Sequence, residues 1–143
     1  MSQSSWLFWA FLSAVFAAMT AVFTKMGVNT VNSDFATFIR TCVILVLVGG
    51  IAFFSKSFQS LSTISSKGLT FLVLSGVATG LSWLCYFRAM SLGQASQVAP
   101  VDKLSVVFVA VLGVLFLGEQ LSTVNWMGVA LITAGVILVA WQG

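Results

Sequence analysis

Three charged residues interrupt long apolar stretches of the sequence. Arg40 lies within the stretch from about residue 35 to 55, and Asp102 and Lys103 lie within the stretch from about residue 97 to 118. A charge at bilayer depth costs at least roughly 2.5 to 3.5 kcal/mol, so it is usually retained for a reason. Opposite charges there could bind a zwitterionic or anionic solute, or the Asp102 carboxylate could exchange a proton for substrate.

Pro100 stands just before the Asp102–Lys103 pair. Because proline lacks the backbone N–H and clashes with the preceding turn, it disfavours a continuous helix. Broken helices at membrane depth line protein or water-filled cavities, as they do around transporter binding sites. The alternative is that Pro100 occupies the first turn of a helix, that Asp102 neutralises Arg40 or Lys103, and that the charges only anchor the helix at the interface.

Polar and aromatic side chains near these charges complete a candidate site. Gln97 could hydrogen-bond a solute, although such side chains also satisfy neighbouring backbone groups. Trp83 and Tyr86 could line the path, but aromatic residues at the headgroup level explain their positions equally. The candidates for substrate binding or coupling are Arg40, Trp83, Tyr86, Gln97, Pro100, Asp102 and Lys103.

The elements that carry these residues are predicted from composition. Of the 143 residues, 59% are hydrophobic and 6% are charged, and the mean hydropathy is +1.10. A soluble domain has about a quarter of its residues charged, so a globular protein in water is excluded. Runs such as Cys42–Val48 are apolar at every position, which favours helices over a membrane β-barrel.

We therefore predict an all-α integral membrane protein with five transmembrane helices. It forms a single transmembrane domain over residues 1–143 and is multi-pass in the cell membrane, which is the cytoplasmic (inner) membrane if the source is bacterial. The N-terminal residues lack the Lys or Arg of a cleavable signal, so the first span is expected to be retained. The predicted spans cover about residues 6–24, 35–55, 68–88, 97–118 and 124–142.

The residue types exclude several classes of function. There is no His and no Glu within a predicted span, so the usual activated nucleophiles and metal-bound waters are missing. We expect no catalytic residue, no metal site and no cofactor. The basic residues are scattered singly and form no patch for nucleic acid. Cys42 and Cys85 are interpreted as space-filling residues of their spans.

Small residues recur at helical spacing in three predicted spans, and Ser13, Ala17 and Ala21 form such a stripe in the first. Gly76 and Gly80 form a G-x-x-x-G in the third, and Ala130 and Ala134 share a face of the fifth. Helices associate in lipid through the close approach of such residues. Packing within one chain and contact between two chains both account for the pattern, and the four residues of the third and fifth spans are the candidates for dimer packing.

The closing part of the sequence resembles the EamA domain of the drug/metabolite transporter superfamily. Ala95–Pro100, Val114–Glu119 and Trp126–Gly135 match its Pro in the fourth helix, its Gly-Glu at the end of that helix, and its Gly-x-x-Leu-Ile-x-x-Gly fifth helix. The junction Tyr86–Met90 and the count of five helices extend the likeness over essentially the whole chain. Glu119 lies at a helix end, where capping or interfacial packing explains it better than coupling chemistry.

The resemblance implies a half-size member, equivalent to one half of a ten-helix inverted-repeat transporter. It implies a secondary transporter, exporter or permease, for a small polar or amphipathic metabolite, with proton coupling left open. The Asp102–Lys103 pair departs from the general family pattern, so the substrate is not carried over. The alternative is a non-transporting membrane subunit that packs into a larger complex.

The resemblance further implies that two copies associate, most simply as an antiparallel homodimer like the related small multidrug resistance proteins. In the loops, Lys56 and Lys67 on one side balance Lys25 and Arg88 on the other. Since Lys and Arg asymmetry sets orientation, this near tie permits dual topology. The competing prediction is a single orientation with the Lys25 and Arg88 loops in the cytoplasm.

Overall fold

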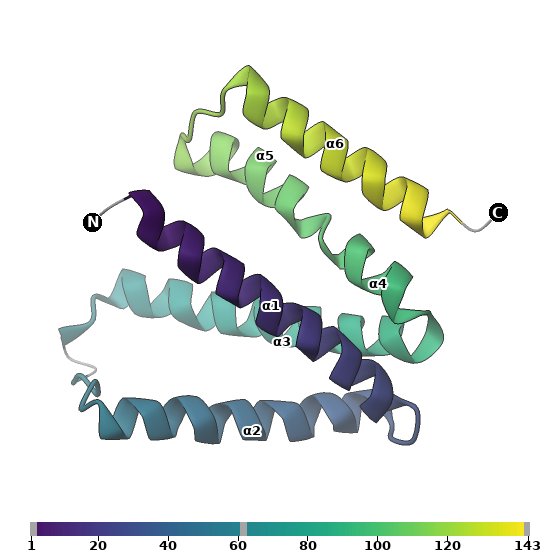
Figure 1. Cartoon of the computed structure of the whole chain (residues 1–143). Coiled ribbons are helices and arrows are strands. Elements are labelled where there is room, and N and C mark those ends of the chain that lie inside the picture. The colour runs from purple at the N-terminus through teal and green to yellow at the C-terminus, as the bar shows by residue number, and fades with distance from the viewer. Residues whose placement is uncertain (1–2, 61–62, 142–143) are drawn as a thin grey trace. The chain divides into compact units, whose positions relative to one another are not determined.

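The computed structural model describes residues 3–60 and 63–141, and all regular elements in these ranges are helices (Figure 1). Five helical segments are long and apolar enough to cross a membrane, and α4 and α5 together make one of them. The predicted all-α class with five transmembrane helices is confirmed. The helices are α1 (Gln3–Val28), α2 (Ser33–Phe54), α3 (Ser66–Leu92), α4 (Ala95–Asp102), α5 (Ser105–Leu117) and α6 (Thr123–Ala140).

Local hydrogen bonds explain where several helices begin. The Asn32 side chain accepts hydrogen bonds from the backbone N–H groups of Asp34 (2.9 Å) and Phe35 (3.4 Å), which caps α2. Ser122 caps α6 by accepting from the N–H of Asn125 at 3.2 Å. These caps satisfy N–H groups that the first turn of a helix leaves without an internal partner.

The end of α5 is set by a left-handed glycine. Gly118 has φ 68°, and the following N–H, of Glu119, donates to the Gly113 carbonyl at 3.1 Å. The N–H of Gly118 donates to the same carbonyl, and a left-handed glycine directly after the last helical residue is a common way to end a helix. In this chain, Gly118 and Glu119 therefore terminate helix α5.

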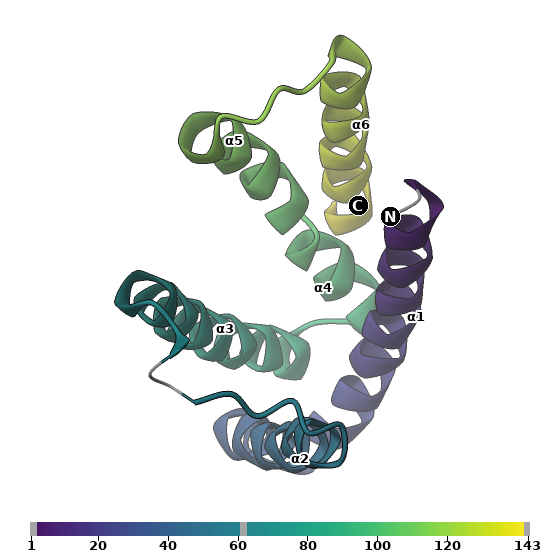
Figure 2. The same cartoon turned by 90° about the vertical axis from the view of Figure 1, so that its left-hand side faces the viewer.

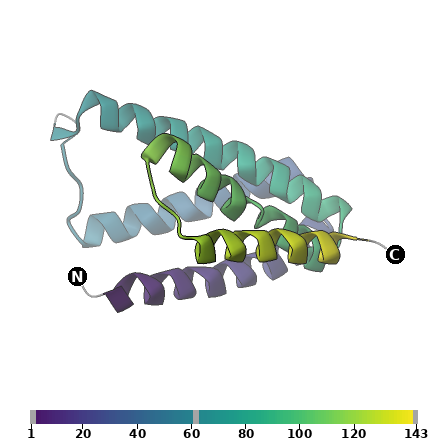
Figure 3. The same ribbon diagram turned by 90° about the horizontal axis from the view of Figure 1, so that it is seen from above.

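The chain divides into two compact units, residues 26–91 and residues 1–25 with 92–143. In the second unit, α6 runs back alongside α5 and α4 in the opposite direction (Figures 1 and 3). The Lys25 ammonium at the C-terminal end of α1 donates to the Gly93 carbonyl at 2.8 Å, in the turn before α4. That residues 1–143 form a single domain stays a prediction.

The first unit is built mainly from α2 and α3. Figure 2, which looks roughly along α2, shows α3 next to it. The two helices converge where α2 begins and α3 ends, and they diverge toward the connection between them (Figures 1 and 3). The buried residues of the two helices lie near the converging end: Ser33, Thr37, Phe87 and Met90.

Most large apolar side chains on the helices are exposed, including Phe11, Phe54 and Leu138. In water this exposure would be very costly, because each large apolar side chain gains about 1.5–3 kcal/mol from burial. In a bilayer, hydrocarbon covers such faces, and helices associate instead through close packing and polar contacts. Membrane insertion therefore accounts for the composition of the helix surfaces.

Candidate functional site

Arg40 is held by aromatic rings of the neighbouring helix. Its guanidinium carbon lies 4.4 Å from the centre of the Trp83 ring and 5.4 Å from that of Phe87. Both distances are within the range of about 6 Å for cation–π attraction. Trp83 and Phe87 stand four residues apart on α3, so they share one face of that helix. We call Arg40, Trp83 and Phe87 the Arg40 cluster.

The Arg40 charge lies inside the second span and has no carboxylate partner within its own unit. Seven residues separate it from Ser33, where α2 begins, which places its backbone about 10 Å along the helix. Asp34 is the only carboxylate in the sequence between residues 26 and 91. Within the described part of that unit, Asp34 and Arg40 form no ion pair. The half-buried guanidinium therefore rests against two aromatic rings and not against a carboxylate of this unit.

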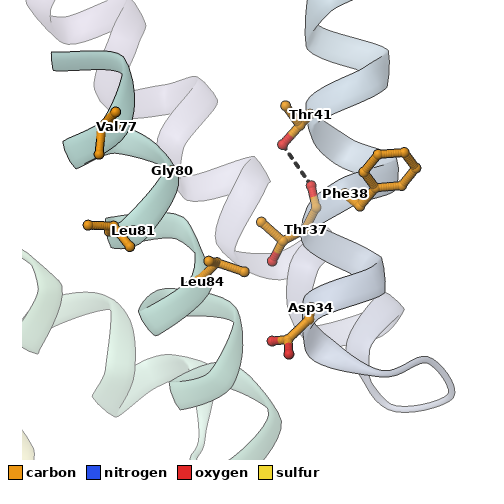
Figure 4. Close-up of a pocket in the computed structure, with 8 residues that line it drawn as sticks. All are labelled: Asp34, Thr37, Phe38, Thr41, Val77, Gly80, Leu81 and Leu84. Atoms are coloured by element: carbon orange, nitrogen blue, oxygen red, sulfur yellow. Dashed lines mark hydrogen bonds between the residues drawn. The ribbon is translucent and has the colours of Figure 1, made fainter. Parts of the chain in front are cut away.

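A groove of about 390 Å³ runs between the same two helices (Figure 4). Asp34 lies at one end of it, and Thr41 and Val77 lie at the other (Figure 4). The Thr37 and Thr41 hydroxyls donate to the carbonyls of Ser33 (2.9 Å) and Thr37 (2.8 Å), so only their oxygen lone pairs remain to accept from a ligand. The lining residues are Asp34, Thr37, Phe38 and Thr41 of α2 and Val77, Gly80, Leu81 and Leu84 of α3.

The second charged cluster lies where the fourth span is interrupted. The N–H groups of Lys103 and Leu104 donate three residues back, to Pro100 and Val101, each at 3.0 Å. These short turns separate α4 from α5, and they keep the backbone hydrogen-bonded through the break. Pro100 lies in the second turn of α4, past its first turn.

Asp102 and Lys103 form an ion pair at this break. The Lys103 Nζ lies 3.2 Å from Asp102 Oδ2, and the two side chains are 55% and 36% exposed. Asp102 is the last residue of α4 and lies seven residues after Ala95, about 10 Å into the fourth span. Of the two partners considered for Asp102, Lys103 belongs to the same unit and contacts it.

The structure thus gathers the candidate residues into two groups, one in each unit. Arg40 meets Trp83, and Tyr86 stands beside this group with its ring 6.5 Å from that of Phe87. Asp102 and Lys103 lie just after Pro100, and Gln97 is half-buried one turn earlier in α4. Binding and coupling by these residues remain predictions.

The four small residues proposed for dimer packing face open space. A Cβ atom added at Gly76 or Gly80 would meet no atom within 4 Å. Ala130 and Ala134 are both exposed on α6. Gly80 also lines the groove between α2 and α3. Contact of these four residues with a second chain stays a prediction.

Sequence reasoning did not select Asp34, Phe38, Leu81, Leu84 or Phe87. A signal for most of them was present, because the groove residues 34, 37, 38 and 41 repeat the spacing of 77, 80, 81 and 84. Each set marks one face of a helix. Because two consecutive spans carry residues with the same spacing, the sequence could have indicated that these two helix faces line one groove.

With this geometry in hand, comparison with known proteins assigns the family. Residues 4–141 match the profile of the EamA-like transporter family. The chain belongs to the EamA-like transporter family. The resemblance noted in the sequence is confirmed, and five spans together with this membership establish a multi-pass membrane protein that acts in transport. Membership of a transporter family also indicates a non-enzymatic role.

Relatives of this EamA protein are similar to it to different extents. A Sinorhizobium protein named as an uncharacterized transporter in the cobO 3′ region is 59% identical over 140 residues, which cover 98% of this chain and 99% of the relative. An uncharacterized protein of Methanocaldococcus jannaschii is 25% identical over 130 residues, covering 91% of this chain and 84% of its own length.

A third relative carries a more specific name. The probable 4-amino-4-deoxy-L-arabinose-phosphoundecaprenol flippase subunit ArnE of Yersinia pestis is 32% identical over 74 residues. The matched part covers 52% of this chain and 65% of the relative. No solved structure matches the chain.

Proposed function

We propose that this EamA protein is a secondary transporter of a small polar or amphipathic metabolite and that it works as a homodimer. The observation that carries the proposal is the broken fourth span, in which an Asp102–Lys103 ion pair stands about 10 Å from the start of α4. Two exposed charges in a membrane-spanning segment need a polar surrounding. A water-filled path beside the break supplies one, as at transporter binding sites.

Two features support the homodimer: five spans correspond to one half of a ten-helix inverted-repeat transporter, and small residues lie on helix faces that have room beside them. Gly76 and Gly80 on α3, and Ala130 and Ala134 on α6, present small side chains with room beside them. Helices of a second copy can approach closely there. An antiparallel arrangement would give the pair the inverted symmetry of a ten-helix transporter, with the substrate path between the copies.

The ion pair suggests how binding and coupling are linked. In the ion pair, Lys103 gives the Asp102 carboxylate a cationic partner at 3.2 Å. A substrate cation or a proton that reaches Asp102 would compete with Lys103, and a substrate anion would compete with Asp102. Alternating access then requires one copy to rock against the other around the occupied site. In this scheme the same charges bind substrate and exchange it.

A second candidate function is that of a subunit in a larger membrane complex. The specific observation in its favour is the Yersinia relative, which is named as a flippase subunit. In that case the chain would need a different partner of complementary surface to transport. For the transporter proposal, the name of this relative favours an amphipathic substrate over a purely polar one.

Reconstitution of the full chain alone separates these candidates. Proteoliposomes of phosphatidylcholine would be tested with radiolabelled amino acids, amines and phosphorylated metabolites for saturable uptake. We expect uptake of at least one class by the wild type and its loss in Asp102→Asn and in Arg40→Ala, because each removes a charge inside a span. Cross-linking would show that both variants still form dimers.

Glu119→Gln is the matched control, since it removes a carboxylate that lies in the connection between α5 and α6, outside the spans. Normal uptake by both charge variants would show that the charges are anchors. The absence of any uptake by the chain alone would overturn the homodimeric transporter and favour the subunit.

A further inference from the structure

The polar side chains that line the groove between α2 and α3 can accept hydrogen bonds from a ligand but cannot donate them. The Thr37 and Thr41 hydroxyls already donate to the carbonyls of Ser33 and Thr37, so they offer only oxygen lone pairs. Asp34 is the one charged residue of the described lining, and an ionised carboxylate is an acceptor alone. The groove therefore presents one negative charge and further acceptors to its ligand.

The Asp34 carboxylate has one oxygen left for a ligand. Ser33 Oγ donates to Asp34 Oδ1 at 3.3 Å, and no side chain in the described part of this unit donates to Oδ2. Asp34 follows the first residue of α2, so it lies close to the membrane face at which this helix begins. A cation that enters the groove from that face meets the carboxylate at the end of the groove (Figure 4).

Beyond Asp34 the groove suits an apolar chain. Phe38, Leu81 and Leu84 line it, and Thr41 lies at its deep end (Figure 4). Thr41 comes seven residues after Asp34 on α2, which is about 10 Å along the helix. The volume of about 390 Å³ lies toward the small end of the range of ligand pockets. The space is that of one short chain.

This lining favours one class of head group. The carboxylate disfavours an anion. A quaternary ammonium has no N–H to donate, so Asp34 and Thr37 would lose water without gaining a hydrogen bond. A primary ammonium carries three donors, as the lysine head group does. Because Thr37 comes three residues after Asp34 and shares its face of α2, one ammonium can donate to both.

We propose that the groove between α2 and α3 binds a single-chain amphiphile with a primary ammonium head group. The head donates to Asp34 and Thr37 near the membrane face, and the apolar chain lies deeper, along Leu84 and Leu81. The inference rests on the proposed transport function, for which it names a substrate class and a second binding surface. It is carried by the single negative charge and acceptors of the lining and by the apolar surface beyond them.

Binding is measured on the purified full chain in a neutral maltoside detergent, as saturable binding of tritiated octylamine in a scintillation proximity assay. Three competitors share the octyl tail and differ in their heads: octyltrimethylammonium (a cation without N–H), octanol (neutral) and octanoate (an anion). We expect each to displace the label about tenfold less well than unlabelled octylamine, because each lacks the charge or the donors. Equal displacement by any of the three would overturn the proposal.

The charge is tested at Asp34. Asp34→Asn should weaken octylamine binding about tenfold, whereas Asp34→Glu keeps the charge and should keep binding. The Asn32 side chain still caps α2 in both variants, so the start of the helix is preserved. Glu119→Gln is the matched control, because it removes a carboxylate from the connection between α5 and α6, outside the groove. Binding of wild-type strength in Asp34→Asn would overturn the proposal.

The donors of the head group are tested at Thr37. Thr37→Val should weaken octylamine binding several-fold and leave octyltrimethylammonium binding unchanged, because only octylamine can donate to the hydroxyl. Thr79→Val is the control, since it removes the same kind of bond, to the Ser75 carbonyl at 2.9 Å, on α3 outside the lining. Equal weakening of both ligands by Thr37→Val would overturn the role of the hydroxyl as an acceptor.

The apolar chain is tested by filling the groove. Gly80→Leu places a side chain where an added Cβ would meet no atom within 4 Å, and it should weaken octylamine binding about tenfold. Ala78→Leu adds similar bulk on α3 outside the lining and should not. Ethylamine, which lacks the chain, and dioleoylphosphatidylethanolamine, which has two chains, should not displace octylamine. Unchanged binding in Gly80→Leu, or displacement by either compound, would overturn the single-chain ligand.

The outcomes for this inference and for the proposed function are distinguishable. Selective binding of octylamine by a chain that transports none of the tested solutes would overturn the proposed function and leave the ammonium site standing. Saturable uptake of a solute by a chain that shows no preference among the four octyl compounds would overturn the ammonium site alone.

Discussion

The contact between Arg40 and Trp83 gives a single-residue test of how the second span tolerates a charge. Replacing Trp83 with Leu removes the ring that lies 4.4 Å from the guanidinium carbon. We expect a loss of about 0.5 to 2 kcal/mol in the free energy of unfolding, because a partly desolvated cation–π contact is worth that much. The measurement is denaturation in detergent micelles followed by circular dichroism.

A double-mutant cycle isolates this interaction. In an Arg40→Met background, Trp83→Leu should cost less, and the difference is the coupling between the two side chains. Phe87→Leu should show weaker coupling, since its ring lies farther from the cation, at 5.4 Å. Equal costs of Trp83→Leu in both backgrounds would show that the ring only fills space.

At the residue scale, the sequence predicted which residues belong to the candidate site better than it predicted which of them contact each other. Arg40 and Trp83 were both candidates, because a charge in an apolar span and an aromatic residue near a span end are visible in the chain itself. Their contact joins residues that are 43 positions apart, and the periodicity of one helix carries no information on which face of the next helix it meets. For the same reason Phe87 was missed.

Among the elements, the end of α5 depends on one backbone conformation. Gly118 has φ 68°, a region that costs a residue with a Cβ roughly 1–2 kcal/mol. Gly118→Ala should therefore lower the free energy of unfolding by about that amount. Gly128→Ala is the control, because Gly128 has no positive φ and no atom within 4 Å of its added Cβ. Equal effects of the two substitutions on thermal unfolding would contradict this account.

The break between α4 and α5 can be tested through Pro100. Pro100→Ala restores a backbone N–H that can donate to the carbonyl four residues earlier, so the fourth span should become more continuous. We expect slower hydrogen exchange of the amides of Lys103, Leu104, Val106 and Val107, which donate three residues back in the wild type. Uptake in proteoliposomes should fall, since the proposed path depends on the break. Unchanged exchange would show that the break is fixed by other residues.

At the element scale, the length of each apolar run predicted the number and order of the spans. The ends were less well predicted, because a charged residue ends an apolar run without ending a helix. Thus α1 continues past Lys25 to Val28, and α3 continues past Arg88 to Leu92. The fourth span is interrupted at Lys103 and Leu104, on the C-terminal side of Pro100. There the backbone N–H groups donate three residues back instead of four.

For the whole molecule, the antiparallel homodimer requires that copies insert in both directions. The positive charges of the loops nearly balance, with Lys56 and Lys67 on one side and Lys25 and Arg88 on the other. Orientation follows the Lys and Arg bias of short loops. A C-terminal reporter that fluoresces only in the cytoplasm, and one active only outside it, should therefore both give signal.

The balance should also be easy to tip. Lys56→Gln leaves one cation in the connection between α2 and α3 against two on the other side, so the more positive loops should move to the cytoplasm in most copies. Because an antiparallel pair needs equal numbers of the two orientations, transport by the variant expressed alone should fall, and co-expression with Lys25→Gln, biased the opposite way, should restore it. Full transport by a population with one orientation would replace the antiparallel pair with a parallel one.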